Sequence, residues 1–293
     1  MKQNLRQSPK ATDHPSMNTP TNRLTIDTQV ATAVLVKFLQ NEIYKAGFQR
    51  AVLGLSGGID SALSCYLAVQ ALGAENVLAV RMPYSASSPE SLEHAGLIIE
   101  DLGLPHETVE ITPMVEPLFA ASPGITPLRK GNVMARARMM VVFDRSAAWK
   151  GLVIGTSNKT ELLLGYGTIY GDLASAVNPI GDLYKTQVRQ MARAVGVPQP
   201  IIDKAPSADL MPGQTDEADF GFTYEQVDEL LQLMVDERYT AEELVAEGFG
   251  AEFVRRVGLM IQRSHYKRAM PIIPKISGRT VGHDFRYLRD WGT

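Results

Sequence analysis

The hydrophobic pattern alternates between short apolar runs and longer stretches with helical spacing. The short runs are rich in Val, Ile and Leu, which predicts strands at residues 51–55, 76–83, 106–111 and 152–156. Between them, apolar positions recur every three or four residues in the stretches 61–73, 88–103 and 127–149. Strands that alternate with helices predict βαβ units, and therefore a parallel sheet covered by helices on both faces.

The two ends of the chain have different patterns. Residues 1–25 are mostly polar and contain proline, which predicts a disordered tail, and a helical pattern opens near Val30. After Gly165 a glycine-rich stretch leads into further helical patterns at residues 183–195, 223–235, 240–247 and 251–264. We therefore expect one α/β domain over residues 26–293, a doubly wound parallel sheet with a C-terminal helical extension.

Composition limits the classes of protein that the chain can belong to. Among its 293 residues, 45% are hydrophobic and 21% are charged, which is typical of a globular protein with a sizeable core. No run approaches the eighteen apolar residues of a membrane span, and the first residues lack the apolar segment of a secretory signal. The net charge of −3 creates no general attraction for nucleic acid.

The chain has a single cysteine, Cys65, within an apolar helical stretch. One cysteine rules out an intramolecular disulfide and a cluster of cysteine metal ligands, and it favours a reducing, cytoplasmic setting. We expect the thiol to be buried and without a chemical role.

The clearest candidate for chemistry lies where the first strand ends and a helix begins. This loop consists of Gly54, Leu55, Ser56, Gly57, Gly58, Ile59, Asp60 and Ser61. Backbone N–H groups are unpaired at such a junction and the helix dipole is positive there, so the loop is suited to bind phosphate. The loop lacks the lysine of the Walker motif and the spacing of the dinucleotide fingerprint.

Asp60 places a carboxylate beside this predicted phosphate site. Without a cation the two anions repel each other, so Asp60 indicates Mg²⁺. The alternative is that the glycines form an ordinary turn and that Asp60 is only a favourable acid in the first helical turn.

The segment Ser56–Ser61, SGGIDS, resembles the SGGxDS loop of the N-type ATP pyrophosphatases, which form adenylates and release pyrophosphate. Later segments resemble the NAD synthetase family, and the resemblance covers roughly residues 30–271. These segments are GTSNKTE (155–161), GYGTIYGD (165–172), NPIGDLYKTQVR (178–189), KAPSADL (204–210) and PGQTDE (212–217).

The resemblance implies a set of binding residues. For ATP they are the eight loop residues above together with Arg81, Thr156, Lys185 and Ser207. For deamido-NAD they are Arg136, Tyr266 and Lys267, and for Mg²⁺ they are Asp60 and Glu161. Taken singly, most of these have ordinary alternatives: Glu161 and Lys185 as solvated helix residues, Arg136 as a surface arginine and Ser207 as a helix N-cap.

The chain departs from the family pattern where the dinucleotide is expected. The family commonly has a lysine and an aspartate in the loop after Glu161, and this chain has Ile169 and Ala176 there. Near the C-terminus, aligning the family pattern from Pro271 places Tyr266 and Lys267 at the substrate positions. The departures leave the ATP loop intact and concern recognition of the dinucleotide.

The resemblance implies the ammonia-dependent amidation of deamido-NAD (nicotinate adenine dinucleotide). ATP would activate the substrate carboxylate as an adenylate, and ammonia would displace AMP to form NAD, in a homodimeric enzyme. Two alternatives stay open: a related ATP pyrophosphatase with another acceptor, such as a tRNA base or a nucleotide, and a non-catalytic adenine-nucleotide sensor. Asp60 and Glu161 argue against the sensor because a sensor has no need to cleave ATP.

Overall fold

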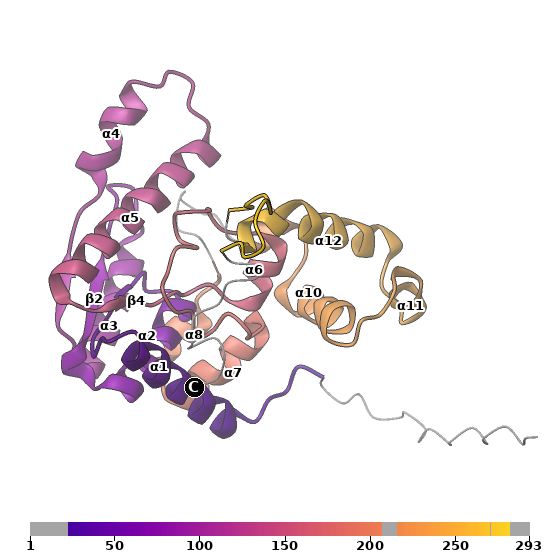
Figure 1. Ribbon diagram of the computed structural model, residues 1–293, viewed down its shortest axis with the longest axis horizontal. Coiled ribbons are helices and arrows are strands. Elements are labelled where there is room, and N and C mark those ends of the chain that lie inside the picture. Colours follow the sequence, from indigo (N-terminus) through magenta and orange to yellow (C-terminus); the bar gives the residue numbers. More distant parts are fainter. Residues whose placement is uncertain (1–22, 207–215, 270, 282–293) are drawn as a thin grey trace, which may run out of the picture.

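The computed structural model describes residues 23–206, 216–269 and 271–281. An α/β body carries a group of C-terminal helices at one side (Figure 1). None of the helices in these residues combines the length and the apolar character needed to cross a membrane. Ser207, one of the expected ATP-binding residues, lies outside the described residues.

The sheet has four parallel strands in the order β3-β2-β1-β4. They are β1 (Ala51–Gly54), β2 (Val77–Arg81), β3 (His106–Thr108) and β4 (Leu152–Val153). In the register, Ala51 is opposite Val77 on one side and Leu152 on the other. The parallel α/β sheet is as predicted, and each strand is shorter than its apolar run because the last residues of the run turn into loops at the carboxyl edge.

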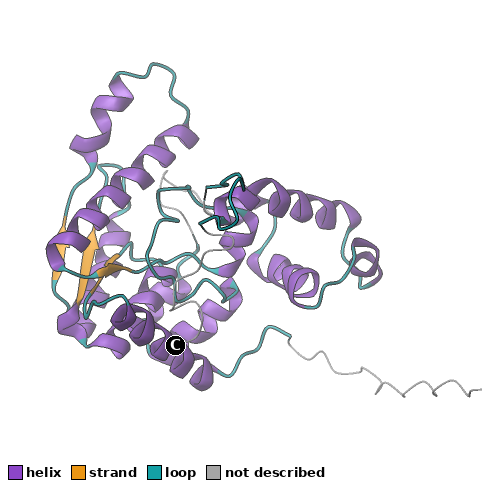
Figure 2. Cartoon of the chain, viewed as in Figure 1, coloured by secondary structure: helices purple, strands orange, loops and turns teal. Residues whose placement is uncertain are grey.

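Alternate residues of β1 face opposite sides of the sheet, and helices cover both sides (Figure 2). Ala51 and Leu53 pack against one layer of helices, and Val52 packs against the other. The first layer contains α1 (Thr28–Lys45), α2 (Ile59–Leu72), α3 (Pro89–Leu102), α7 (Lys185–Val195) and α8 (Gln199–Asp203). The second contains α4 (Thr112–Ala120) and α5 (Pro127–Trp149). The fold is therefore doubly wound.

The C-terminal helices form a third apolar cluster of their own. This helical extension consists of α10 (Tyr224–Leu231), a π-helical segment (Gln232–Asp236), α11 (Ala241–Ala246) and α12 (Ala251–Ser264). It packs around α6 (Lys159–Leu164) and α9 (Asp216–Phe220), and the side chain of Leu24 is buried in the same cluster. The expected helical extension is present.

The hydrophobic pattern does not predict α4. Pro113 lies in its first turn and Pro117 in its interior, and a proline removes a donor from the helical hydrogen-bond ladder. Val115 and Phe119 are nevertheless buried against α5 and the sheet. Tertiary packing therefore outweighs the local cost of the prolines.

Candidate active site

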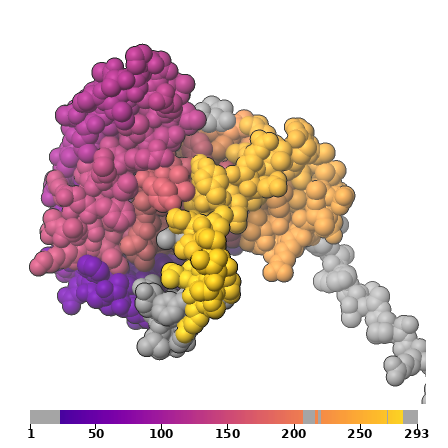
Figure 3. Space-filling model, turned by 45° about the horizontal axis from the view of Figure 1, so that its top comes forward, coloured from indigo at the N-terminus to yellow at the C-terminus, as the bar shows by residue number. Residues whose placement is uncertain are grey.

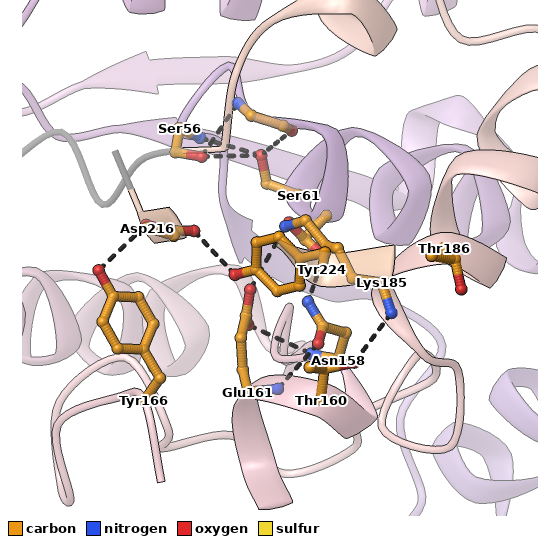
Figure 4. A network of polar contacts seen from close by, with 12 residues as sticks. Ser56, Ser61, Asn158, Thr160, Glu161, Tyr166, Lys185, Thr186, Asp216 and Tyr224 are labelled. Atoms are coloured by element: carbon orange, nitrogen blue, oxygen red, sulfur yellow. Dashed lines mark hydrogen bonds and ion pairs between the residues drawn. The ribbon is translucent and has the colours of Figure 1, made fainter. Parts of the chain in front are cut away.

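The loop between β1 and α2 is closed by hydrogen bonds of its own serines. The Ser61 hydroxyl donates to the Gly58 carbonyl oxygen (3.0 Å) and accepts from the Ser56 backbone N–H (3.3 Å). The Ser56 hydroxyl accepts from the Gly58 N–H (3.2 Å) and pairs with the Ser61 hydroxyl (3.0 Å; Figure 4). Within the described residues no side chain caps α2, so its first N–H groups remain free to bind an anion.

Gly57 is required by the backbone of this loop. Its φ of +79° lies in the left-handed region, and a Cβ atom there would be 2.1 Å from the Ser91 carbonyl oxygen at the start of α3. Any other residue would displace α3 or open the loop. The loop therefore has its shape because glycine lets two main-chain segments approach closely.

Three helices bring charged side chains to this loop. The Lys185 ammonium, from the first residue of α7, lies 2.5 Å from an Asp60 carboxylate oxygen and 3.4 Å from a Glu161 carboxylate oxygen. Only 3% of the Lys185 side chain is exposed, so it is not a solvated helix lysine. Asp60, Glu161 and Lys185 are distant in sequence, and the fold makes them neighbours.

Asn158 links two of these charges, and sequence reasoning did not single it out. Its side-chain amide donates to Asp60 (2.8 Å), and its amide oxygen accepts from the Glu161 N–H (3.0 Å) as the N-cap of α6. The Glu161 side chain accepts in turn from the Asn158 N–H, which completes a capping box. The Asn-x-x-Glu spacing was the available signal.

The cluster contains more acidic groups than basic ones. Burial raises the pKa of Glu161 to about 8, the Asp60 charge adds to the rise, and Lys185 opposes it. Burial lowers the pKa of the Lys185 ammonium, but the charges of Asp60 and Glu161 outweigh it and the pKa is raised overall. Lys185 therefore remains protonated, while the buried Glu161 carboxyl holds its proton up to about pH 8.

A third carboxylate, Asp216, lies close to the same cluster. It accepts hydrogen bonds from the Tyr224 hydroxyl (2.9 Å) and from the Tyr166 hydroxyl (3.0 Å; Figure 4). Burial raises the pKa of Asp216, and the charge of Lys185 lowers it. Asp216 lies within the PGQTDE segment, but nothing in its local pattern distinguished it from a surface acid.

The other expected ATP residues lie at the same carboxyl edge of the sheet where they are described. Arg81 is the last residue of β2, and its guanidinium donates to the Thr108 hydroxyl at the end of β3 (3.0 Å). Thr156 follows β4 and is half-buried. Ligands bind at this edge in open α/β sheets, so the arrangement is compatible with a nucleotide site.

The expected dinucleotide residues surround the loop of residues 165–171. Arg136, on α5, donates to the Ile169 carbonyl oxygen (3.3 Å). The Lys267 ammonium donates to the Gly165 and Gly167 carbonyl oxygens, at 2.8 Å each, and Tyr266 beside it is 56% exposed. Lys267 thus already binds the main chain of the loop. Ala176 is exposed.

A shallow pocket of about 170 Å³ adjoins this loop through Arg136. Its lining is formed by α5, the end of α4 and their connection: Leu118, Ser122, Ile125, Arg129, Asn132, Val133 and Arg136. The described residues that follow α12, 265–269 and 271–281, lie between the α4–α5 layer and the helical extension (yellow, Figure 3). Arg129 and Arg136 therefore lie beside apolar side chains in this pocket.

The residues around Lys185 are compatible with a divalent cation. The described residues contain no group of three or more His, Cys, Asp or Glu side chains arranged as a metal site. Asp60 and Glu161 nevertheless provide hard oxygen donors, and both lie within 3.4 Å of the same Lys185 ammonium. Mg²⁺ prefers few carboxylates together with phosphate oxygens, so two carboxylates beside a phosphate loop fit this ion.

Comparison with known proteins places the chain in a family. Residues 31–271 match the NAD synthase family. The NH(3)-dependent NAD(+) synthetase of Trichlorobacter lovleyi is 60% identical, over 92% of this chain and 99% of the relative, and that of Chlorobium phaeovibrioides is 61% identical, over 92% and 97%.

Solved structures agree with the sequence relatives. The NH3-dependent NAD synthetase of Campylobacter jejuni superposes with a TM-score of 0.73 at 36% identity, over 85% of this chain and 100% of the other. The NMN synthetase of Francisella tularensis superposes with a TM-score of 0.77 at 33% identity, over 86% and 100%. Because the family model matches most of the chain and the relatives match over nearly their whole length, the chain belongs to the NAD synthase family.

Proposed function

We propose that the chain is an ammonia-dependent NAD synthetase. It converts deamido-NAD, ATP and ammonia into NAD, AMP and pyrophosphate through an adenylated intermediate. The observation that carries the proposal is the 60% identity to the Trichlorobacter lovleyi synthetase over 99% of that protein. The cluster of Asp60, Glu161 and Lys185 beside the phosphate loop supports it because this reaction brings a carboxylate to the ATP phosphates and releases pyrophosphate, so phosphate charge must be stabilised.

The reaction has two balanced steps. A carboxylate oxygen of deamido-NAD attacks the α-phosphorus of ATP, and the bond to the bridging oxygen breaks with release of pyrophosphate. Ammonia then attacks the acyl carbon, AMP leaves, and the nitrogen loses a proton to form the amide. The N–H groups of the Ser56–Ser61 loop and the Lys185 ammonium stabilise the phosphate charge in the first step.

Asp60 and Glu161 are the residues that would hold Mg²⁺. The ion would neutralise charge on the phosphates of ATP, which two carboxylates and one lysine do not achieve. The Lys185 ammonium contacts both the Asp60 and the Glu161 carboxylates. The ammonium would be free to turn toward phosphate when a cation joins the cluster.

Ammonia, and not glutamine, is the proposed nitrogen donor. Use of glutamine requires a nucleophile such as an activated cysteine thiolate. The sole cysteine, Cys65, is fully buried in α2, and burial raises the pKa of its thiol to about 12. Cys65 therefore cannot serve as an amidase nucleophile.

We also propose that two copies of the chain form a homodimer through α4 and α5. Large apolar side chains are exposed on these two helices: Met114, Leu118, Leu128, Met140 and Phe143, of which Leu128 is 75% exposed. Such an accumulation is typical of an interface between proteins. The pocket at Arg136 adjoins this surface, so a second copy would cover the dinucleotide site.

A second candidate substrate is nicotinate mononucleotide. Ile169 and Ala176 replace a lysine and an aspartate that the family commonly directs at the dinucleotide. The superposition on an NMN synthetase, with a TM-score of 0.77, is compatible with a smaller acceptor. The chemistry at ATP is the same for both substrates, so only the acceptor distinguishes the two candidates.

The test is a purified-protein assay with ATP, Mg²⁺ and either ammonium or ammonia-free glutamine. We expect NAD and stoichiometric pyrophosphate from deamido-NAD with ammonium, and none with glutamine alone. Asp60→Ala should lower turnover by about 10²-fold or more. Asp203→Ala, which removes an exposed acid of α8, should leave turnover unchanged.

Three outcomes would contradict the proposal. Faster turnover of nicotinate mononucleotide than of deamido-NAD would favour the second candidate. Turnover with glutamine equal to that with ammonium would exclude the proposed nitrogen donor. Normal turnover by Asp60→Ala at saturating Mg²⁺ would remove Asp60 from the metal site.

A further inference from the structure

A buried carboxylate of the helical extension contacts both helices that carry the charged cluster. Asp228 lies on α10 and is 0% exposed. One of its oxygens accepts from the Thr160 hydroxyl (2.5 Å), and the other accepts from the Thr186 backbone N–H (2.8 Å). Thr160 directly precedes Glu161 on α6, and Thr186 directly follows Lys185 on α7.

The Thr160 hydroxyl connects the two helices a second time. While it donates to Asp228, it accepts from the Lys185 backbone N–H (3.0 Å). Thr160 is 0% exposed, so water does not replace these bonds. Asp228, Thr160 and the first turn of α7 therefore form a closed set of hydrogen bonds beside the charged cluster.

This arrangement has an energetic reason to be rigid. A carboxylate without solvent is costly unless donors satisfy it, and here both oxygens of Asp228 are satisfied. The first turn of α7 presents free N–H groups and a positive dipole, which favours a negative charge at that position. Any shift of α6 against α7 would break a buried hydrogen bond, so the distance between Glu161 and Lys185 is held.

The helix that carries Glu161 needs such support. α6 has six residues, and a helix of this length is not stable through its own hydrogen bonds. Its capping box orients the Glu161 side chain relative to Asn158, but it does not set the position of the whole helix against α7. The hydrogen bond from Thr160 to Asp228 sets this position, because Asp228 on α10 also binds the start of α7.

We propose that Asp228 is a positioning residue for the groups that bind Mg²⁺ and the ATP phosphates. It holds Glu161 and Lys185 against Asp60 from the helical extension, without touching the substrate. The inference rests on the proposed function, because the positioned groups are those that bind Mg²⁺ and ATP. It makes the helical extension part of the catalytic apparatus.

The test compares variants that remove or retain the Thr160 hydroxyl with a variant that removes the Asp228 charge. Thr160→Val removes the hydroxyl at equal volume, Thr160→Ser retains it, and Asp228→Asn removes the charge. Ser264→Ala is the matched control, because the Ser264 hydroxyl donates to the Leu163 carbonyl oxygen at the far end of α6 and Ser264 is also buried. All four are purified, and the melting temperature of each is measured first.

Thr160→Val and Asp228→Asn should raise the Mg²⁺ concentration for half-maximal activity and the KM for ATP by about fivefold to tenfold, the equivalent of one buried hydrogen bond. The KM for deamido-NAD should stay within about twofold, since its expected site at Arg136 lies on α5. Thr160→Ser should match the unchanged protein. Ser264→Ala should lower the melting temperature and leave the Mg²⁺ requirement unchanged.

A calorimetric titration of Mg²⁺ and ATP without acceptor separates this inference from the proposed function. If the unchanged protein does not convert deamido-NAD, the proposed acceptor is refuted. If folded Thr160→Val then still binds Mg²⁺ and ATP more weakly than the unchanged protein, the positioning role of Asp228 stands. Equal binding and equal Mg²⁺ requirement in Thr160→Val and the unchanged protein would overturn the positioning role. So would a shift of the same size in Ser264→Ala.

Discussion

At the scale of single residues, the site is dominated by an excess of buried acidic groups over basic ones. Asp60, Glu161 and Asp216 contribute three carboxylates, and Lys185 contributes one ammonium. A fold that needed only stability would neutralise or remove these groups, because buried ions are costly to desolvate. The imbalance is useful to a protein that must bind a cation together with a polyphosphate.

The raised pKa of Glu161 predicts a stability that depends on pH in the absence of metal. Its pKa is about 8 in the folded chain and near 4.5 when unperturbed, so the folded chain binds an extra proton between these values. The free energy of unfolding therefore falls as pH rises from about 4.5 to about 8. Glu161→Gln should remove this loss and melt a few degrees higher than the unchanged protein at pH 8.5 in EDTA.

The measurement is thermal unfolding followed by circular dichroism at pH 5 and pH 8.5. The advantage of Glu161→Gln should shrink toward pH 5, where the unchanged side chain is protonated. Glu229→Gln, an exposed acid on α10, serves as the control and should show no such dependence. An equal advantage at both pH values would mean that Glu161 is not buried with a raised pKa.

At the scale of elements, α6 is a short helix that is fastened at both ends. Asn158 caps its N-terminus, and Arg268 binds its C-terminus by donating to the Leu162 and Leu163 carbonyl oxygens, at 2.9 Å each. Arg268 also donates to the Ile261 carbonyl oxygen of α12 (2.8 Å). One guanidinium thereby joins the ends of two helices, with its charge at their negative dipole ends.

Arg268→Lys should destabilise the fold although the charge is retained. A lysine ammonium lacks the planar fork that reaches both α6 and α12 at once, so carbonyl groups would lose their partners. We expect a loss of about 1–3 kcal/mol in the free energy of unfolding, measured by urea titration. Arg263→Lys, on the exposed side of α12, should be neutral, and an equal loss in both variants would refute the role of Arg268.

At the scale of the whole molecule, the α4–α5 layer covers the sheet with one side and exposes apolar side chains on the other. Val115 and Val141 are buried against the sheet, and Leu128 and Phe143 point outward. A layer that is apolar on both sides is typical of a helix pair between two cores. This outer apolar side is where we propose that the second copy binds.

Leu128→Asp should convert the proposed dimer into a monomer, because it places a charge in an apolar interface. Analytical ultracentrifugation at several micromolar protein is the measurement. Val245→Asp, at an exposed apolar position of α11 that is remote from α4 and α5, is the control and should remain dimeric. A sedimentation coefficient unchanged by Leu128→Asp, or dissociation by both variants, would place the interface elsewhere.

Local sequence patterns determined much of the architecture. The alternation of apolar runs and helical stretches was sufficient for a parallel sheet covered on both faces, because side-chain periodicity reflects burial directly. The glycines and serines of the Ser56–Ser61 loop indicated a phosphate site, because the turn between a strand and a helix is a local structure. The burial of Cys65 followed from its apolar neighbours in the same helix.

Only the tertiary structure decided which buried charges meet. Lys185 pairs with Asp60 across 125 residues, and Asp228 reaches Thr160 across 68. No local pattern separates Asp216 or Asp228 from the exposed acids around them, since their burial depends on how the helical extension docks. For the same reason the pattern missed α4, whose prolines are outweighed by packing on α5. Periodicity records which face of an element is buried, whereas the partner of each buried charge depends on contacts made only after the elements have packed together.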